Sequence, residues 1–171
     1  MIIVCPLSQA PSIARDRKPS RVVSLLDPGT TFPVLGFGDD QHLRMSVHDI
    51  EEEMDGLDRP AQHHMQAILT FVRSWDRADP MLIHCYAGLS RSTATAFITA
   101  CAHNPDIDEH RIALALREAS EHAAPNRRFV ALADAALGRN GRMSAAIDAI
   151  GRGANWYEIG ENKPFTLASR F

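Results

Sequence analysis

Short apolar stretches alternate with amphipathic ones along this chain, and the alternation limits the folds that are open to it. Three stretches, at residues 2–5, 22–26 and 81–83, are apolar apart from Ser24 and contain β-branched residues. This is typical of parallel strands that are buried on both faces. A further stretch, at residues 43–47, alternates between apolar and polar side chains and predicts a fourth strand. Strands of this kind need helices on both sides of the sheet.

Apolar residues at helical spacing predict those helices. One stripe runs along residues 65–75 and another along residues 129–137, where Gly138 stands in the position of a helix C-cap. A third helix, over residues 91–105, is apolar on nearly all sides and should be central. Further helices are expected at residues 108–119 and 143–150. The sequence therefore predicts an α/β fold in a single domain, residues 1–171, with a central, mostly parallel sheet of about four or five strands and helices on both faces.

Composition excludes several classes of function. A net charge of −3 provides no basic field for binding nucleic acid. No apolar run approaches the ~20 residues needed to cross a bilayer, so membrane insertion is not expected. The three cysteines form no C-x-x-C pair, and no charged segment precedes the first apolar run as in a signal peptide. These features favour a cytoplasmic protein.

The residues that carry chemistry follow the strand at residues 81–83, because ligands bind such sheets at the carboxyl ends of the strands. A loop between strand and helix can turn its backbone N–H groups into an anion-binding nest, which the positive end of the helix reinforces. Gly88 would allow a positive φ or a close approach, and Arg91 offers a planar fork that matches two phosphoryl oxygens. The predicted phosphate-binding residues are Tyr86, Ala87, Gly88, Leu89, Ser90 and Arg91.

Cys85 stands at the head of this predicted nest. Helix N-termini and neighbouring cations lower thiol pKa values to ~3.5–7.5, so such a site favours a thiolate nucleophile and needs no metal or other cofactor. The alternative is an inert core thiol, since free cysteines are often buried. His84 is expected to orient the loop by hydrogen bonding, a role close to that of an ordinary buried histidine.

The segment from His84 to Ser92 resembles the signature H-C-x-x-G-x-x-R-[ST] of the cysteine-dependent protein tyrosine phosphatases and matches it at each fixed position. The resemblance implies a metal-independent hydrolase in which Cys85 attacks phosphorus and Arg91 holds the phosphoryl group. Water then hydrolyses the phosphocysteine, while Ser92 donates a hydrogen bond to the departing thiolate. The likeness is to the dual-specificity branch, because no Trp-Pro-Asp occurs, and it is strongest over residues 22–137.

The resemblance also implies a general acid, an Asp on a loop well before the cysteine. Asp49 follows the predicted strand at residues 43–47 and is expected to protonate the leaving oxygen. Asp55 and Asp58 remain alternatives, and Asp49 could instead cap a helix. The pair Pro125-Asn126 before the helix at residues 129–137 also resembles the dual-specificity pattern, and Asn126 should be a helix N-cap.

The implied substrate is a phosphorylated protein or a small phosphomonoester. Phosphotyrosine is the default, with phosphoserine and phosphothreonine as alternatives. The absence of lysine between Tyr86 and Ser90, together with the net charge of −3, argues against a highly anionic lipid.

Three other possibilities remain open at this point. A rhodanese-like sulfurtransferase or an arsenate reductase also uses a cysteine-headed anion loop, but would not need Asp49. A pseudophosphatase would bind phosphoproteins without turnover, which a misplaced Asp49 would favour.

Cys5 or Cys101 could form a protective disulfide with Cys85, as in parts of the family. Residues 152–171 match no known pattern and could simply cover an exposed surface.

Overall fold

The centre of the protein is a five-stranded sheet in the order β3-β2-β4-β1-β5. The computed structural model describes residues 1–171. The strands are β1 (Ile2–Pro6), β2 (Arg21–Leu26), β3 (His42–Ser46), β4 (Met81–Cys85) and β5 (Phe165–Leu167). β4 lies between β1 and β2 and is parallel to both, whereas β5 is antiparallel to β1. The predicted α/β fold with a mostly parallel sheet of four or five strands is confirmed.

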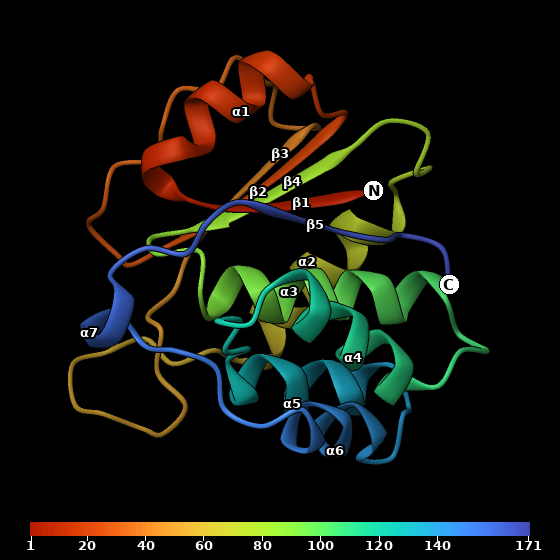
Figure 1. Cartoon of the computed structure of the whole chain (residues 1–171). Helices are drawn as coiled ribbons and strands as arrows, with labels where there is room; N and C mark the ends of the chain where they lie inside the picture. Colours follow the sequence, from red (N-terminus) through yellow and green to blue (C-terminus); the bar gives the residue numbers. More distant parts are fainter.

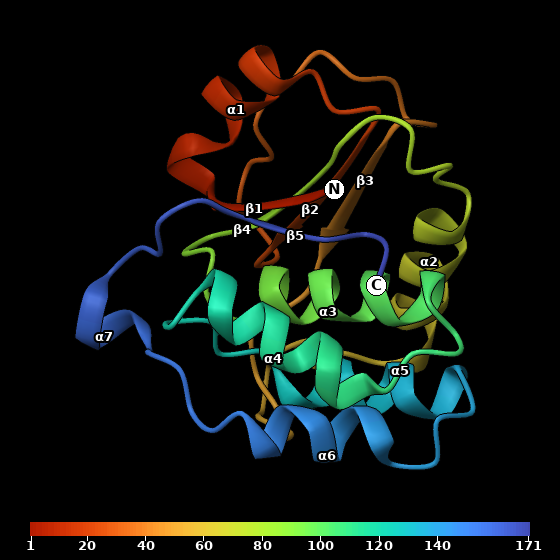
Figure 2. The ribbon, with the colours of Figure 1, turned by 45° about the vertical axis from the view of Figure 1, so that its right-hand side comes forward.

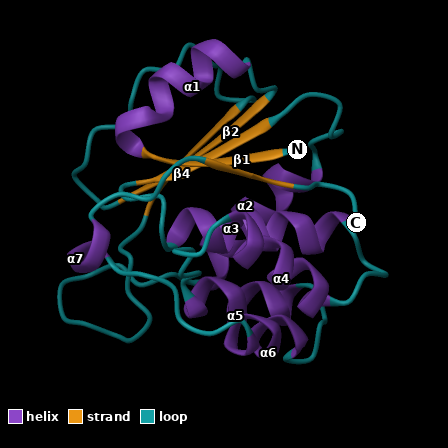
Figure 3. Cartoon of the chain, viewed as in Figure 1, coloured by secondary structure: helices purple, strands orange, loops and turns teal.

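Helices cover the two faces of this sheet unequally (Figures 1 and 2). One face carries only α1 (Ala10–Arg17), and the other carries five helices stacked in two layers (Figure 3). These five are α2 (Gln62–Arg73), α3 (Arg91–His103), α4 (Glu109–Ala119), α5 (Arg127–Ala136) and α6 (Arg142–Ala149). Two short pieces, the 3-10 helix η1 (Leu7–Gln9) and α7 (Trp156–Ile159), complete the chain. None of the helices has both the length and the apolar character that spanning a lipid bilayer requires.

β1 is apolar throughout because its successive side chains enter different cores. In β1, Ile2 and Val4 belong to the larger cluster of 31 buried residues, whereas Ile3 and Cys5 belong to a cluster of six that includes residues of α1. This alternation follows from the two-residue period of a strand. The predicted central helix is α3, in which every residue from Arg91 to Cys101 is buried.

The parallel strands end together at one edge of the sheet. Pro6 pairs with Cys85, and Leu26 pairs with Ser46, so the loops that follow these strands start side by side. The buried α3 starts at the same edge, after the loop that follows β4. This edge therefore gathers segments that are far apart in the sequence, as expected for a ligand site in an α/β sheet.

A row of three buried polar side chains crosses the sheet just before this edge. Ser24 Oγ lies 2.7 Å from His42 Nε2 and 2.6 Å from His84 Nε2, and His84 Nδ1 lies 3.4 Å from the carbonyl oxygen of Cys85. If His84 donates from Nδ1 to that carbonyl, its Nε2 accepts from Ser24 and Ser24 accepts from His42 Nε2–H. His42 Nδ1 is then an unprotonated nitrogen, and it is buried without a hydrogen-bond partner.

Both histidines of this row are neutral in the folded protein at neutral pH. Burial lowers the pKa of His42 to about 4, with a smaller contribution from the positive charge of Arg44. Burial also lowers the pKa of His84 to about 4, partly offset by its hydrogen bond to the backbone of Cys85.

We predict that acid weakens the fold through this row. In the unfolded chain the two histidines take up protons near their ordinary pKa of 6.5, whereas in the folded protein they do so only near 4. Stability is therefore complete above pH 6.5 and falls as the pH drops to about 4, by on the order of 3 kcal/mol for each histidine. Urea unfolding at a series of pH values measures this loss.

A His42→Gln variant keeps an amide donor near Ser24 but does not titrate, so its stability should depend less steeply on pH between 6.5 and 4. Replacing the exposed His110 of α4 by Asn is the matched control and should leave the slope unchanged. Identical slopes for wild type and the His42 variant would contradict the prediction.

Candidate active site

The loop between β4 and α3 is held by hydrogen bonds to its carbonyl oxygens from outside the loop. The donors and acceptors are Leu7 N to Tyr86 O (3.0 Å), Asn162 N to Ala87 O (2.9 Å), Asn162 Nδ2 to Gly88 O (3.1 Å), Ala124 N to Leu89 O (2.9 Å) and Asn126 N to Ser90 O (3.4 Å). In a trans peptide the C=O and N–H groups point in opposite directions. Carbonyl groups that point outward therefore turn the N–H groups of the loop inward, which is the arrangement of an anion nest.

Gly88 is required in this loop for both of the reasons expected from the sequence. Its φ is +71°, a conformation that costs side-chain-bearing residues energy. A Cβ atom at this position would lie 2.8 Å from the backbone nitrogen of Pro6 and 2.9 Å from the carbonyl carbon of Cys5. The loop thus packs directly on the end of β1, where only glycine fits.

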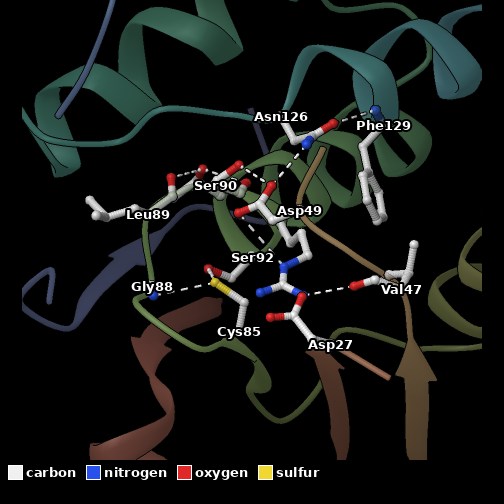
Figure 4. A network of polar contacts seen from close by, with 12 residues as sticks. Asp27, Val47, Asp49, Cys85, Gly88, Leu89, Ser90, Ser92, Asn126 and Phe129 are labelled. Carbon is white, nitrogen blue, oxygen red and sulfur yellow. Dashed lines mark hydrogen bonds and ion pairs between the residues drawn. The ribbon is translucent and has the colours of Figure 1, made fainter. Parts of the chain in front are cut away.

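Cys85 is the last residue of β4, and its side chain lies at the base of the nest (Figure 4). The residue is 2% exposed. Gly88 N–H donates to its Sγ atom at 3.3 Å, and Ser92 Oγ, in the first turn of α3, lies 3.1 Å from the same sulfur. The sulfur thus contacts an N–H donor and a hydroxyl at the N-terminal, positive end of α3.

The other two cysteines differ from Cys85 in their surroundings. Burial raises the pKa of Cys5 to about 12, and burial also raises the pKa of Cys101, so both thiols stay protonated at neutral pH. All three thiols are free. Cys5 pairs with His84 and so faces the side of the sheet opposite to Cys85, and Cys101 lies about 15 Å beyond Arg91 along α3. Neither is placed to bridge Cys85 without backbone movement.

Arg91, the first residue of α3, places a buried guanidinium beside the loop. Its side chain is 3% exposed, and Nη1 donates to Asp27 Oδ1 at 2.8 Å and to the carbonyl oxygen of Val47 at 2.7 Å. Its Nε–H group is buried and has no hydrogen-bond partner, with Asp49 Oδ2 at 3.7 Å. A buried guanidinium that is fixed on one side and retains a free donor is suited to binding an oxyanion.

The sequence did not point to Asp27, the residue that fixes Arg91 on that side. It is the first residue after β2 and so lies at the same edge of the sheet as Cys85. Its position after a strand predicted to be buried was a usable signal, because the carboxyl ends of parallel strands meet at one edge.

Asp49 lies three residues after β3 and is held by the loop itself. Its Oδ1 accepts hydrogen bonds from Ser90 Oγ at 2.7 Å and from Asn126 Nδ2 at 2.8 Å (Figure 4). Asn126 also caps α5, since its Oδ1 accepts from Phe129 N–H at 3.0 Å. Asp49 itself caps no helix, because no helix forms between β3 and α2.

These residues line one cavity of about 410 Å³. Its wall contains Cys85, Arg91 and Asp49 together with Asp27 and Asn126, but neither of the alternative acids, Asp55 and Asp58. The predicted residues Tyr86, Ala87, Leu89 and Ser90 also line it, whereas Gly88, Ser92 and His84 do not. The lining also includes Trp156, whose ring centroid is 5.4 Å from that of Tyr86.

The fold around this site is found in several solved phosphatase structures. DUSP15 superimposes with a TM-score of 0.61 and 18% identity over 86% of this chain and 90% of that chain. PTP-2 phosphatase of Cydia pomonella superimposes with a TM-score of 0.59 and 22% identity over 78% of this chain and 84% of that chain. PTPMT1, in a complex with PI(5)P, superimposes with a TM-score of 0.59 and 12% identity over 81% of this chain and 91% of that chain. The sequence matches no family model and no curated protein. The chain thus has the fold of the dual-specificity phosphatases, as its sequence resemblance implied.

We predict that Gly88→Ala destabilises the protein more than Gly138→Ala does. Both glycines have a positive φ, of +71° and +66°, but a Cβ at Gly138 meets nothing within 4 Å. The control should lose about 1–2 kcal/mol for its φ alone, and Gly88→Ala about 1–3 kcal/mol more because of the contact with β1.

Urea unfolding with and without inorganic phosphate tests both the stability and the anion site. Phosphate should stabilise wild type and Gly138→Ala, because a ligand that binds only the folded state raises its stability. It should have little effect on Gly88→Ala. Equal losses of stability in the two variants would contradict the close packing on β1.

Proposed function

We propose that the protein is a cytoplasmic phosphomonoester hydrolase that forms a phosphocysteine intermediate on Cys85. The observation that carries this proposal is the buried Arg91 guanidinium, which keeps an unpartnered Nε–H beside a loop whose N–H groups turn toward Cys85. This arrangement presents hydrogen-bond donors that no protein group accepts, beside a guanidinium that Asp27 already fixes on one side. The likeness in fold to dual-specificity phosphatases supports the same chemistry.

In the first step the thiolate of Cys85 attacks phosphorus opposite the leaving oxygen. The P–S bond forms, the P–O bond breaks, and Asp49 gives its proton to the leaving oxygen. The inward N–H groups and Arg91 hold the three remaining phosphoryl oxygens as charge develops on them. Because Asp49 Oδ1 already accepts two hydrogen bonds, Oδ2 is the oxygen that carries the transferred proton.

In the second step water hydrolyses the phosphocysteine. Asp49, now a carboxylate, accepts a proton from the water as it attacks phosphorus, and the P–S bond breaks. The sulfur leaves as a thiolate, which Ser92 stabilises from 3.1 Å and Gly88 N–H from 3.3 Å. Inorganic phosphate is released and the site returns to its initial state.

The expected substrates are phosphotyrosine, phosphoserine or phosphothreonine in proteins, or small phosphomonoesters. The cavity places the carboxylates of Asp27, Asp49 and Glu51 around the single cation of Arg91. Such a balance disfavours substrates that carry several phosphates. The complex of PTPMT1 with PI(5)P concerns that protein, and the loop of this chain has no lysine to meet additional phosphates.

The contacts of Asp49 favour turnover over the alternative functions. A sulfurtransferase or an arsenate reductase needs no acid facing the leaving group, and a pseudophosphatase needs no acid at all. Here Ser90 and Asn126 both hold Asp49 in the cavity that contains Cys85. The phosphatase proposal accounts for this arrangement and the alternatives do not.

We predict that wild type hydrolyses an aryl phosphate in the presence of a metal chelator. Cys85→Ser should abolish turnover, since the hydroxyl is a far weaker nucleophile at neutral pH. Asp49→Asn should lower kcat by roughly 10²–10⁴ and flatten the basic limb of the pH profile, because that limb reports loss of the acid's proton. Steady-state rates across pH measure both effects.

Asp55→Asn is the matched control, since Asp55 is an exposed carboxylate outside the cavity. It should leave the pH profile as in wild type. Full turnover by Cys85→Ser would end the phosphatase proposal. An unchanged profile for Asp49→Asn would move the acid role to Asp55 or Asp58.

A further inference from the structure

The segment between α6 and β5 runs from α6 past α7 to the sheet (Figures 1 and 2). Its first residues are fixed to α4 and to the turn that follows α4. Arg117 Nη2 donates to the carbonyl oxygen of Gly151 at 3.0 Å, and Ala154 N–H donates to that of His122 at 3.1 Å. Gly153 leaves no room for a Cβ, because its Cα lies against the backbone of Ala123. We call residues 151–162 the C-terminal strap.

The strap ends on the phosphate loop through one buried residue. Asn162 is 4% exposed, its N–H donates to Ala87 O at 2.9 Å, and its Nδ2 donates to Gly88 O at 3.1 Å. No other group donates to these two carbonyl oxygens. Ser120, at the end of α4, lies 3.0 Å from Asn162 Nδ2 and keeps the amide in place.

The peptide planes held by Asn162 are those that shape the nest. The carbonyl of Ala87 belongs to the same peptide unit as Gly88 N–H, which donates to Cys85 Sγ at 3.3 Å. The carbonyl of Gly88 belongs to the same unit as Leu89 N–H. If either plane rotated, a carbonyl oxygen would replace an N–H group as the neighbour of the sulfur and of a bound phosphoryl group.

We propose that Asn162 is a positioning residue of the phosphate loop, so that the C-terminal strap is part of the active site. This inference rests on the proposed function. It requires that the strap act on the loop geometry and not only on the stability of the fold.

The test compares Asn162→Ala and Asn162→Asp with wild type in aryl phosphate hydrolysis and in vanadate binding, at a temperature where all are folded. Asn162→Ala should lower kcat roughly 10–100-fold and weaken vanadate binding, as misplacement of reacting groups does. Asn162→Asp should lose at least as much, because a carboxylate would face the carbonyl oxygen of Gly88.

Two variants of β5 serve as controls. Thr166→Ala alters an exposed side chain and should keep kcat within about twofold of wild type, whereas Leu167→Ala weakens the packing of β5 without touching the loop. Wild-type kcat and vanadate binding in Asn162→Ala, or an equal loss in Leu167→Ala, would overturn the inference. If wild type itself has no turnover, the proposed function fails, and vanadate binding by the same variants still decides the role of Asn162.

A separate observation concerns the other contact of the strap with the site. The rings of Trp156 and Tyr86 lie 5.4 Å apart at 59° and form one wall of the cavity that contains Cys85. Both side chains are about half exposed and so retain surface for a ligand. We infer that Trp156 is a specificity-determining residue that favours an aromatic leaving group by ring contact.

Trp156→Ala should lower the ratio of kcat/KM for a phosphotyrosine peptide to kcat/KM for the matching phosphoserine peptide by roughly 3–10-fold. Trp156→Phe should keep most of that ratio. Tyr157→Ala is the control, since Tyr157 is 95% exposed and does not line the cavity. An unchanged ratio in Trp156→Ala, in an enzyme that turns over, would overturn this second inference alone.

Discussion

The outward orientation of the carbonyl groups between Cys85 and Arg91 is the constraint on which the site depends. Their hydrogen-bond donors come from the start of η1, the connection between α4 and α5, and the C-terminal strap. No single local segment could supply them. The sheet and the helices therefore act as a frame that keeps the loop open as an anion nest, so that binding an anion needs little further ordering.

A buried cation completes the nest. Arg91 is held on one side by Asp27 and by the backbone of Val47, and its unpartnered Nε–H remains available. An unpaired buried donor costs free energy, and a bound phosphoryl group would remove that cost. On the other side of Cys85, His84 connects the loop to a buried polar row across the sheet. Cys85 thus has the fixed guanidinium of Arg91 on one side and the buried row of Ser24, His42 and His84 on the other.

The sequence predicted what depends on neighbouring residues and missed what depends on distant ones. Strands β1 to β4 and helices α2 to α6 have apolar patterns that the sequence analysis could use. It did not predict α1 or β5, because α1 buries only Ala10 and Ala14, and β5 is three residues long with only Leu167 buried. The loop from Cys85 to Ser92 was predicted as a contiguous motif. Its partners Asn162 and Trp156 reach it only through the tertiary fold, and no local pattern identifies them. Asp27 also reaches it through the fold, but its position directly after β2 was a usable signal.

The central claim is that the preformed loop holds a phosphoryl group against the sulfur of Cys85. Mass spectrometry of the protein, rapidly quenched during turnover of an aryl phosphate, tests it most directly. Cys5, with a pKa of about 12, and Cys101, whose pKa is also raised by burial, stay protonated at neutral pH and are not expected to react. The account predicts a phosphate adduct on Cys85 in wild type and no adduct in Cys85→Ser. Turnover with no adduct on Cys85, or with the adduct on another residue, would contradict it.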